Sequence, residues 1–304
     1  MKSIAKNLRC YFFEINKGIL IAVSSFTAIL VFINYHFGLD NFIRKNNTDL
    51  IKLLAWYAVF LLSFSIPYFI TGFFKSVTYL KRPAFLFLLL IAPLVFAIKL
   101  SFGFTFFITK DPYLNSYWNH IIEWPLLLLI IASLLFLIWN FFDKDQPLYG
   151  LTGRNLDWKP YLLMILIMIP LIAAASTQAD FLSMYPKLHT IAGVDNENEI
   201  TWWHKLLFEL SYGSDFISIE LFFRGFLILA FIKWAGKDAI LPMACFYCTI
   251  HFGKPLGECI SSYFGGIILG VVVYHTRSIY GGLLVHLGIA WLMELGGYIG
   301  NTLN

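Results

Sequence analysis

Long apolar runs separated by short polar stretches dominate this chain. A helix needs about 20 mainly apolar residues to cross a bilayer, and most of the runs reach that length. The predicted membrane-spanning segments are 18–37, 53–74, 83–103, 121–142, 160–176, 214–235, 239–252, 257–275 and 279–299. Segment 239–252 is short for a span, so we expect a buried or partly inserted helix there. The pattern predicts an all-α fold, a polytopic transmembrane helix bundle with eight to nine spans.

The polar stretches divide the chain into three predicted regions. Residues 1–176 form N-terminal transmembrane support helices, and residues 177–213 form a loop. This loop passes through an acidic patch at 195–199 into WWHKLLFELSY, where large apolar side chains recur at helical spacing, as in an interfacial helix. Residues 214–304 form the C-terminal bundle, which we expect to carry the function because ionisable residues within apolar segments concentrate there.

Composition supports a membrane protein. Hydrophobic residues make up 59% of the chain and charged residues 13%, against about 25% charged in ordinary soluble proteins. A bilayer can accommodate that much apolar surface, so the membrane is the first expected partner. The net charge of +4 is spread along the chain without a basic block, which excludes a nucleic-acid partner. Lysine and arginine are more frequent in the loops on the side of the N-terminus, which predicts a cytoplasmic N-terminus. The expected location is a bacterial cytoplasmic membrane.

The four cysteines do not form a disulfide framework in a chain of this length. Cys245 and Cys248 form a C-x-x-C inside an apolar run, and the sequence contains no second such pair. We therefore interpret them as small buried apolar residues rather than as a redox pair or half of a metal site.

Ionisable residues inside apolar segments are the candidate functional residues, because a charge in a bilayer is costly and usually faces the bundle interior. Glu220 and Arg224 lie four residues apart and can neutralise each other. His251 ends the short segment 239–252, and His286 lies within the last apolar segment. Each residue alone has a structural explanation. Together, a carboxylate and two imidazoles on three successive segments could polarise one water molecule, so we predict that Glu220, His251 and His286 face one polar cavity.

Three short motifs follow each other in this region: ELFFRG from Glu220, HFGKPLGE from His251, and GGLLVH ending at His286. Their order on membrane helices resembles the CPBP family, the CAAX prenyl protease type II-like or Abi intramembrane proteases, over roughly residues 205–296. The resemblance implies an intramembrane endopeptidase that cleaves membrane-associated peptides or proteins. Prenylated substrates follow from the family name alone.

The resemblance also implies roles for single residues. In the family a pair of adjacent glutamates opens the first motif, and the first of them activates water together with the histidine of the second motif. The last histidine, with an Asn or Asp four residues later, holds the oxyanion. Transferred to this chain, Glu220 is the second glutamate, Arg224 follows it, His251 binds water and His286 holds the oxyanion.

Two positions depart from the family pattern: Ile219 replaces the first glutamate, and Ala290 replaces the Asn or Asp. Glu220 itself, Glu258 or Glu294 are the alternatives for the missing base, and Arg224, Glu258 and Glu294 are the expected supporting residues. Tyr247 also stands where the family usually has Phe.

A metal is left open. Glu220, His251 and His286 could ligate Zn²⁺, but the sequence contains no H-E-x-x-H.

Two other classes of function stay open beside the peptidase. A catalytically inactive family member would act as a membrane scaffold or binding protein, and Ile219 and Ala290 favour that interpretation. An ion- or proton-coupled transporter would use the ionisable residues as a pathway. It would predict broken helices repeated in both halves of the chain, and the sequence shows no such repetition.

Overall fold

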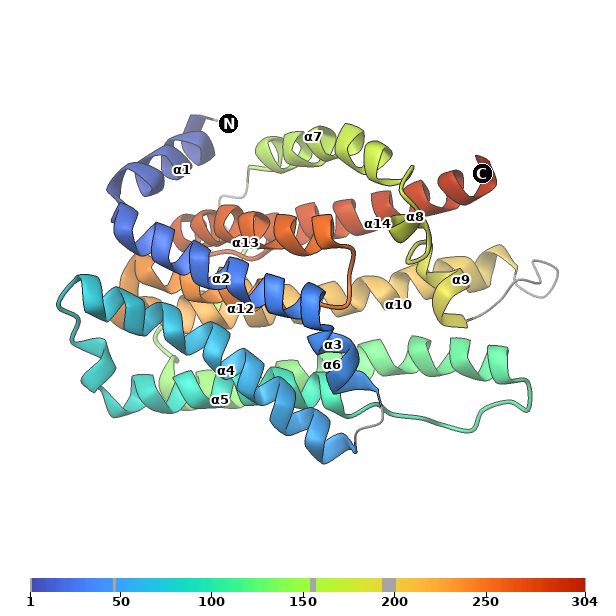
Figure 1. Ribbon diagram of the computed structural model, residues 1–304, viewed down its shortest axis with the longest axis horizontal. Helices are drawn as coiled ribbons and strands as arrows, with labels where there is room; N and C mark the ends of the chain where they lie inside the picture. The colour runs from blue at the N-terminus through green and yellow to red at the C-terminus, as the bar shows by residue number, and fades with distance from the viewer. Residues whose placement is uncertain (1, 46–47, 154–156, 193–200, 304) are drawn as a thin grey trace. The chain divides into compact units, whose positions relative to one another are not determined.

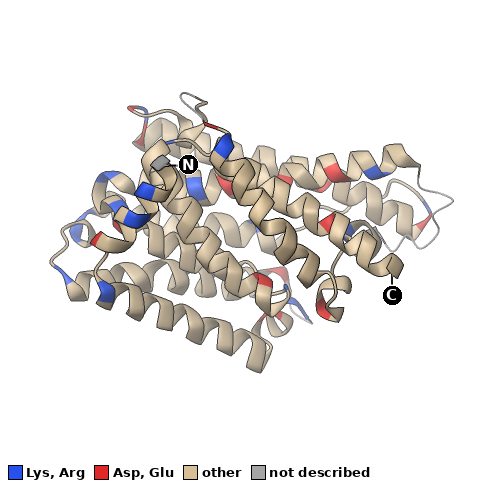
Figure 2. Cartoon of the chain, turned by 90° about the horizontal axis from the view of Figure 1, so that it is seen from above, with Lys and Arg blue, Asp and Glu red and all other residues tan. Residues whose placement is uncertain are grey.

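The computed structural model describes residues 2–45, 48–153, 157–192 and 201–303 (Figure 1). Every regular element within these residues is helical, which confirms the predicted all-α class. The positions of Lys, Arg, Asp and Glu, coloured blue and red, are few along the helices (Figure 2). The acidic patch predicted at 195–199 lies outside the described residues.

The helices alternate with short turns along the chain. Their bounds are α1 Lys2–Glu14, α2 Lys17–Phe37, α3 Leu39–Arg44, α4 Asp49–Phe74, η1 Tyr79–Lys81, α5 Pro83–Ser101, α6 Pro112–Phe142, η2 Leu148–Gly150, α7 Lys159–Ala175, α8 Ala179–Leu182, α9 Lys187–Ala192, α10 Trp202–Glu220, η3 Leu221–Ala230, α11 Ile232–Ala235, η4 Gly236–Ala239, α12 Ile240–Thr249, α13 Leu256–Thr276 and α14 Tyr280–Leu303.

Six helices in the described part of the chain are long and apolar enough to cross a membrane: α2, α4, α5, α6, α13 and α14. They coincide with six of the predicted spans, and the chain is an integral membrane protein. The predicted span 160–176 corresponds to α7, which has only 17 residues. The predicted segment 239–252 corresponds to α12, whose ten residues are all buried. That result confirms the expectation of a short helix packed among others.

The predicted span 214–235 does not begin as a separate element. Helix α10 runs without a break from Trp202 to Glu220 and continues directly into η3. The sequence between the predicted interfacial helix and this span contains Gly213 but no proline, so nothing ends the helix there. Element η3 is a π-helix of ten residues, a rare conformation that often marks functional sites.

The described chain forms two compact units, each assembled from segments far apart in sequence. The first unit comprises residues 1–103, 139–152 and 222–279. Helix α12 forms its centre and packs against α13, α4 and α2, as expected for a helix that is apolar on every side. Gly266 of α13 allows close packing on α12, because a Cβ at this position would lie 3.2 Å from the backbone of Ala244.

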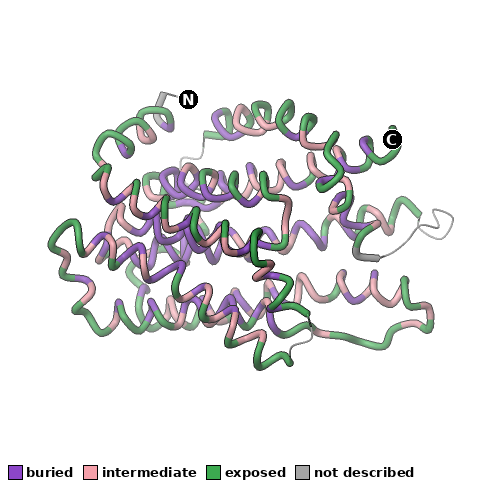
Figure 3. Tube along the Cα trace, viewed as in Figure 1, coloured by how far each residue is buried: buried purple, intermediate pink, exposed green. Residues whose placement is uncertain are grey.

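The second unit comprises residues 104–138, 153–221 and 280–304. Helix α14 packs against α7, α10 and α8 in this unit. An apolar cluster joins α6, α9, α10 and α14; its buried members are Tyr117, Ile121, Leu188, Phe208, Tyr212, Phe216 and Ala290. Figure 3 marks the buried residues in purple, and they recur along the packed faces of the helices.

Candidate active site

A buried carboxylate–imidazole pair lies in the second unit. Glu220 is the last residue of α10, and His286 lies in the second turn of α14. The Nδ1 atom of His286 is 2.9 Å from Oε1 of Glu220. The glutamate side chain is fully buried, and the imidazole is 14% exposed. A carboxylate removed from water needs such a partner, because an uncompensated buried charge is strongly destabilising.

The glycines of the third motif make room for this pair. A Cβ at Gly282 would lie 2.8 Å from Oε2 of Glu220, which is closer than a carbon and a carboxylate oxygen can approach. Gly282 is therefore the residue that allows the carboxylate to lie against α14. Gly281, its neighbour, does the same for the ring of Tyr161, whose atoms would lie within 2.5 Å of an added Cβ.

Apolar side chains surround the pair. The ring of Phe216, one turn before Glu220, packs edge-on against the imidazole of His286, with ring centroids 4.7 Å apart. Both positions that depart from the family pattern belong to the same apolar cluster of the second unit: Ala290 is a buried member, and Ile219 packs against the cluster. The two replacements are thus chemically consistent with each other, since both are apolar and share one environment.

The geometry determines what the pair can do. Because Nδ1 faces the carboxylate, any role of the imidazole toward a substrate would fall to Nε2. If the pair holds one proton, Nδ1–H donates to Glu220 and Nε2 is an acceptor. If the pair holds two protons as an ion pair, Nε2–H is a donor that can stabilise a negatively charged oxygen. The pair therefore suits either proton uptake or anion stabilisation, depending on its protonation state.

Three other predicted site residues, Arg224, His251 and Glu258, lie in the first unit. Arg224, in η3, is 1% exposed, and its guanidinium carbon lies 3.8 Å from the ring centroid of Tyr247 on α12. The ring of Tyr247 also packs edge-on against His251, at 4.7 Å between centroids. Nδ1 of His251 lies 2.9 Å from the carbonyl oxygen of Tyr247. Tyr247 thus contacts two of the predicted site residues.

The turn that follows α12 carries His251, and the N-terminal helices hold this turn in place. Asn34 of α2 is buried; its Nδ2 donates to the carbonyl of Phe252 at 2.9 Å, and its Oδ1 accepts the N–H of Asp40 at 2.9 Å. The hydroxyl of Tyr35 donates to the carbonyl of Lys254 at 2.6 Å. Gly38 ends α2 with a φ of 68°, the left-handed conformation that glycine adopts at little cost.

The supporting carboxylates have other partners. Glu258, in the first turn of α13, forms an ion pair with Lys254 at 3.5 Å. Oε2 of Glu294 accepts the backbone N–H of Lys187 at 2.7 Å. Glu294 lies eight residues beyond His286 on α14, which is about 12 Å along the helix axis. Glu294 therefore connects the start of α9 to α14 and lies away from the Glu220–His286 pair.

The cysteine that contacts Cys248 is not the one that the C-x-x-C motif places near it in sequence. Cys245 and Cys248 are both buried, as predicted for small apolar residues. The neighbour of Cys248 is Cys259 on α13, with the two sulfurs 3.7 Å apart. The C-x-x-C spacing gives no indication of this contact.

A catalytic zinc site needs about three protein ligands and an open position. The second unit supplies two of the predicted donors, Glu220 and His286. Within the described ranges no group of three or more His, Cys, Asp or Glu side chains is placed to hold a metal ion. Glu220 and His286 alone do not make up such a ligand set, and the proposed reaction uses only side chains of the protein.

The predicted shared site is therefore present in part. Glu220 and His286 meet in one unit, while His251, Arg224 and Glu258 belong to the other. A common cavity for all three predicted catalytic residues stays a prediction.

Fold and site together define an integral membrane protein with a buried acid–base pair on its later helices. Residues 203–292 match the family model described as type II CAAX prenyl endopeptidase Rce1-like. The chain therefore contains a domain of this CAAX protease family, which confirms the resemblance. The match includes α10, α12, α13 and the site-bearing part of α14. Comparisons with curated proteins and with solved structures found no match.

The contacts made by Tyr247 and Asn34 were not predicted from the sequence. For Tyr247 the signal was its position four residues before His251, one helical turn away. For Asn34 the signal was an amide inside an otherwise apolar span, since a polar side chain there needs a partner. An amide is not ionisable, but the cost of burying it without a partner follows from the same physical principle.

Substitution of Gly282 tests the room that this residue gives to Glu220. We expect Gly282→Ala to lower the melting temperature of the purified protein, because the new methyl group displaces a buried carboxylate; overpacking costs about 1–3 kcal/mol. Glu220→Asp shortens the side chain and should relieve the clash. The two substitutions should therefore be less destabilising together than the sum of their separate effects. Purely additive effects would contradict the contact.

Substitution of Asn34 tests the support of the His251 turn. Asn34→Leu removes the partners of the Phe252 carbonyl and the Asp40 N–H, each loss costing about 1–3 kcal/mol. We expect faster hydrogen exchange in residues 250–256 of the intact protein. Thr27→Val is the matched control, because it changes another buried polar residue of α2, whose hydroxyl donates to the Val23 carbonyl of the same helix. Equal exchange in the two variants would rule out the support.

Proposed function

We propose that this protein is an intramembrane endopeptidase that cleaves membrane-associated peptides or proteins. The observation that carries the proposal is the buried Glu220–His286 contact of 2.9 Å within the matched family domain. Keeping a carboxylate and an imidazole together in an apolar environment is costly for a protein that only needs a stable fold. A site that moves protons gives a reason for such a pair.

The proposed reaction is hydrolysis of a peptide bond by an activated water molecule. His251 orients the water, and the Glu220 carboxylate accepts its proton as the oxygen attacks the carbonyl carbon. Protonated His286, held by Glu220 through Nδ1, donates from Nε2 to the oxygen that becomes negative. The C–N bond then breaks, and Glu220 returns the proton to the leaving amine.

The substrate class follows from the location of the residues. Glu220 and His286 belong to helices of an integral membrane protein, so the scissile bond has to reach them from the membrane or its surface. The loop charges favour a cytoplasmic N-terminus, and we propose a bacterial cytoplasmic membrane as the location.

A second candidate function is a catalytically inactive relative that binds membrane proteins. The observation that favours it is the shared apolar environment of Ile219 and Ala290, because two polar family positions have changed together. Such a protein would keep the Glu220–His286 pair for stability alone.

Loss of the base tests the proposed reaction. We expect Glu220→Gln to reduce cleavage of a membrane-anchored reporter by about 10²–10⁴-fold, because an amide cannot take up a proton. His251→Ala should reduce cleavage to a similar extent, and both variants should remain folded.

The matched control is Glu209→Gln, the same chemical change on the same helix α10 and outside the pair. This variant should cleave like the wild type. Cleavage that persists in Glu220→Gln would remove Glu220 from the mechanism.

Restoring the family residues distinguishes the two candidate functions. We expect the wild type to be active and the double variant Ile219→Glu with Ala290→Asn to cleave within about tenfold of it, a difference of about 1.4 kcal/mol in the barrier. Ile219→Glu alone should lower the melting temperature, because it places a carboxylate against the apolar cluster. Cleavage by the double variant only would show that the natural protein has lost the reaction and would favour the scaffold.

A further inference from the structure

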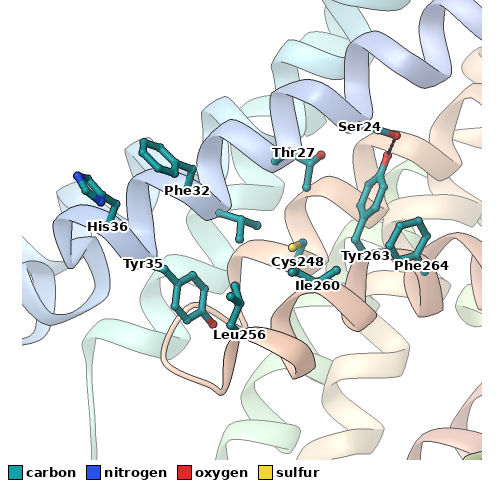
Figure 4. A pocket seen from close by; sticks show the side chains of 12 residues that line it. Ser24, Thr27, Phe32, Tyr35, His36, Cys248, Leu256, Ile260, Tyr263 and Phe264 are labelled. Atoms are coloured by element: carbon teal, nitrogen blue, oxygen red, sulfur yellow. Dashed lines mark hydrogen bonds between the residues drawn. The ribbon is translucent and has the colours of Figure 1, made fainter. Parts of the chain in front are cut away.

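An apolar groove of about 540 Å³ lies in the first unit between α2 and α13, with part of α12 at its base (Figure 4). It belongs to the unit without the Glu220–His286 pair, and the proposed reaction does not use it. Both α2 and α13 are candidate membrane spans, so the groove opens at the depth of the bilayer. Its volume lies within the range typical of small-molecule sites, about 300–1,000 Å³.

The polar groups deep in the groove are already bonded within the protein. The hydroxyls of Ser24 and Tyr263 lie 3.0 Å apart, and that of Thr27 donates to the Val23 carbonyl. The thiol of Cys248 contacts Cys259. These groups thus already have partners within the protein, and the other side chains of the groove are mainly apolar, so a polar occupant would lose most of its bonds to water without replacement. The chemistry of this part of the groove selects a hydrocarbon.

The length of the groove matches one leaflet of a membrane. It runs along α2 from Ser24 to His36, which is about 18 Å at 1.5 Å per residue. The hydrocarbon core of a bilayer is about 30 Å thick, so one leaflet measures about 15 Å. Because α2 ends at Phe37, the groove extends from one end of the span to slightly beyond its middle. This is the space that one chain of a bilayer lipid occupies.

The groove is longer than it is wide. A volume of about 540 Å³ over a length of about 18 Å at 1.5 Å per residue suits an extended occupant such as a single hydrocarbon chain.

The two ends of the groove differ in their polar groups. Tyr35 and His36 are exposed and lie toward the end that Leu256 marks, whereas Ser24 and Phe264 mark the opposite end, where the hydroxyls of Ser24 and Tyr263 contact each other (Figure 4). The Tyr35 hydroxyl bonds the backbone of Lys254, whose ammonium pairs with Glu258. An amphiphile with its head group at the His36–Lys254 end and its chain toward Ser24 would match this polarity.

We propose that the groove binds one acyl chain of a bilayer phospholipid, with the head group at the His36–Lys254 end. Tyr35 lines the groove and also bonds the turn that carries His251. A bound lipid would therefore contact a residue that supports this turn. The inference does not depend on peptidase activity, because binding is measured directly.

Photo-crosslinking of the full chain in phosphatidylcholine vesicles tests the proposal. The probe is a phosphatidylcholine with a diazirine on one acyl chain, placed either near the carboxyl group or near the chain end. We expect the first probe to label the Tyr35–Leu256 end and the second to label the Ser24–Phe264 end. Labelling that ignores the diazirine position, or that is equal on every exposed span, would overturn the proposal.

A substitution that fills the groove tests the site, and a neighbouring substitution outside the groove is its control. Ala28 lines the groove, and its neighbour Ile29 does not. We expect Ala28→Trp to reduce labelling of the groove by about tenfold, because the indole displaces several chain methylenes, and Ile29→Trp to leave it unchanged. Ile260→Trp on α13 is the second filling variant if Ala28→Trp fails to fold. Unchanged labelling in a folded filling variant would contradict the site.

A competition experiment identifies the kind of hydrocarbon. Excess unlabelled phosphatidylcholine should displace the probe from the groove, and an isoprenoid alcohol of similar length should do so less well. Displacement by the isoprenoid alone would overturn the assignment to a phospholipid.

Discussion

A carboxylate that is fully buried in a membrane protein has to find its partner inside the protein, and this constraint organises the second unit. Glu220 meets His286 at 2.9 Å, and the neighbouring residues accommodate that contact. Gly282 leaves space for the second carboxylate oxygen, and Phe216 covers the imidazole. The motif GGLLVH thus serves packing as well as chemistry. Gly281 lies against α7, and Gly282 and His286 lie against Glu220 of α10.

In the first unit, backbone carbonyl groups likewise find their partners inside the protein. The turn after α12 exposes carbonyls that no helix satisfies, and Asn34 and Tyr35 of α2 bond two of them. These two residues precede the matched family domain by a long stretch of chain, so the N-terminal part contributes directly to the geometry of the motif turn. The groove also lies along α2, so the lipid proposed to bind there would lie beside these contacts.

The fold gives one explanation for both positions that depart from the family pattern. Ile219 and Ala290 lie on different helices, α10 and α14, yet both pack into one apolar cluster. A polar residue at either position would need a polar partner nearby, so the two positions are expected to change together.

Hydropathy and length by themselves determined the fold class and most spans, because crossing a bilayer depends on the local composition of a segment. The short segment 239–252 was also correctly expected to be buried. The motifs identified Glu220 and His286, and the cost of burying them indicated that each needed a partner.

Only the tertiary structure decided which partners they have. The pairing of Glu220 with His286, the position of Tyr247 between Arg224 and His251, and the neighbour of Cys248 all depend on how several helices pack at once. Sequence spacing predicts contacts one helical turn apart, such as that of Tyr247 with His251. It does not predict contacts between helices, because these are set by the shapes of all their faces together.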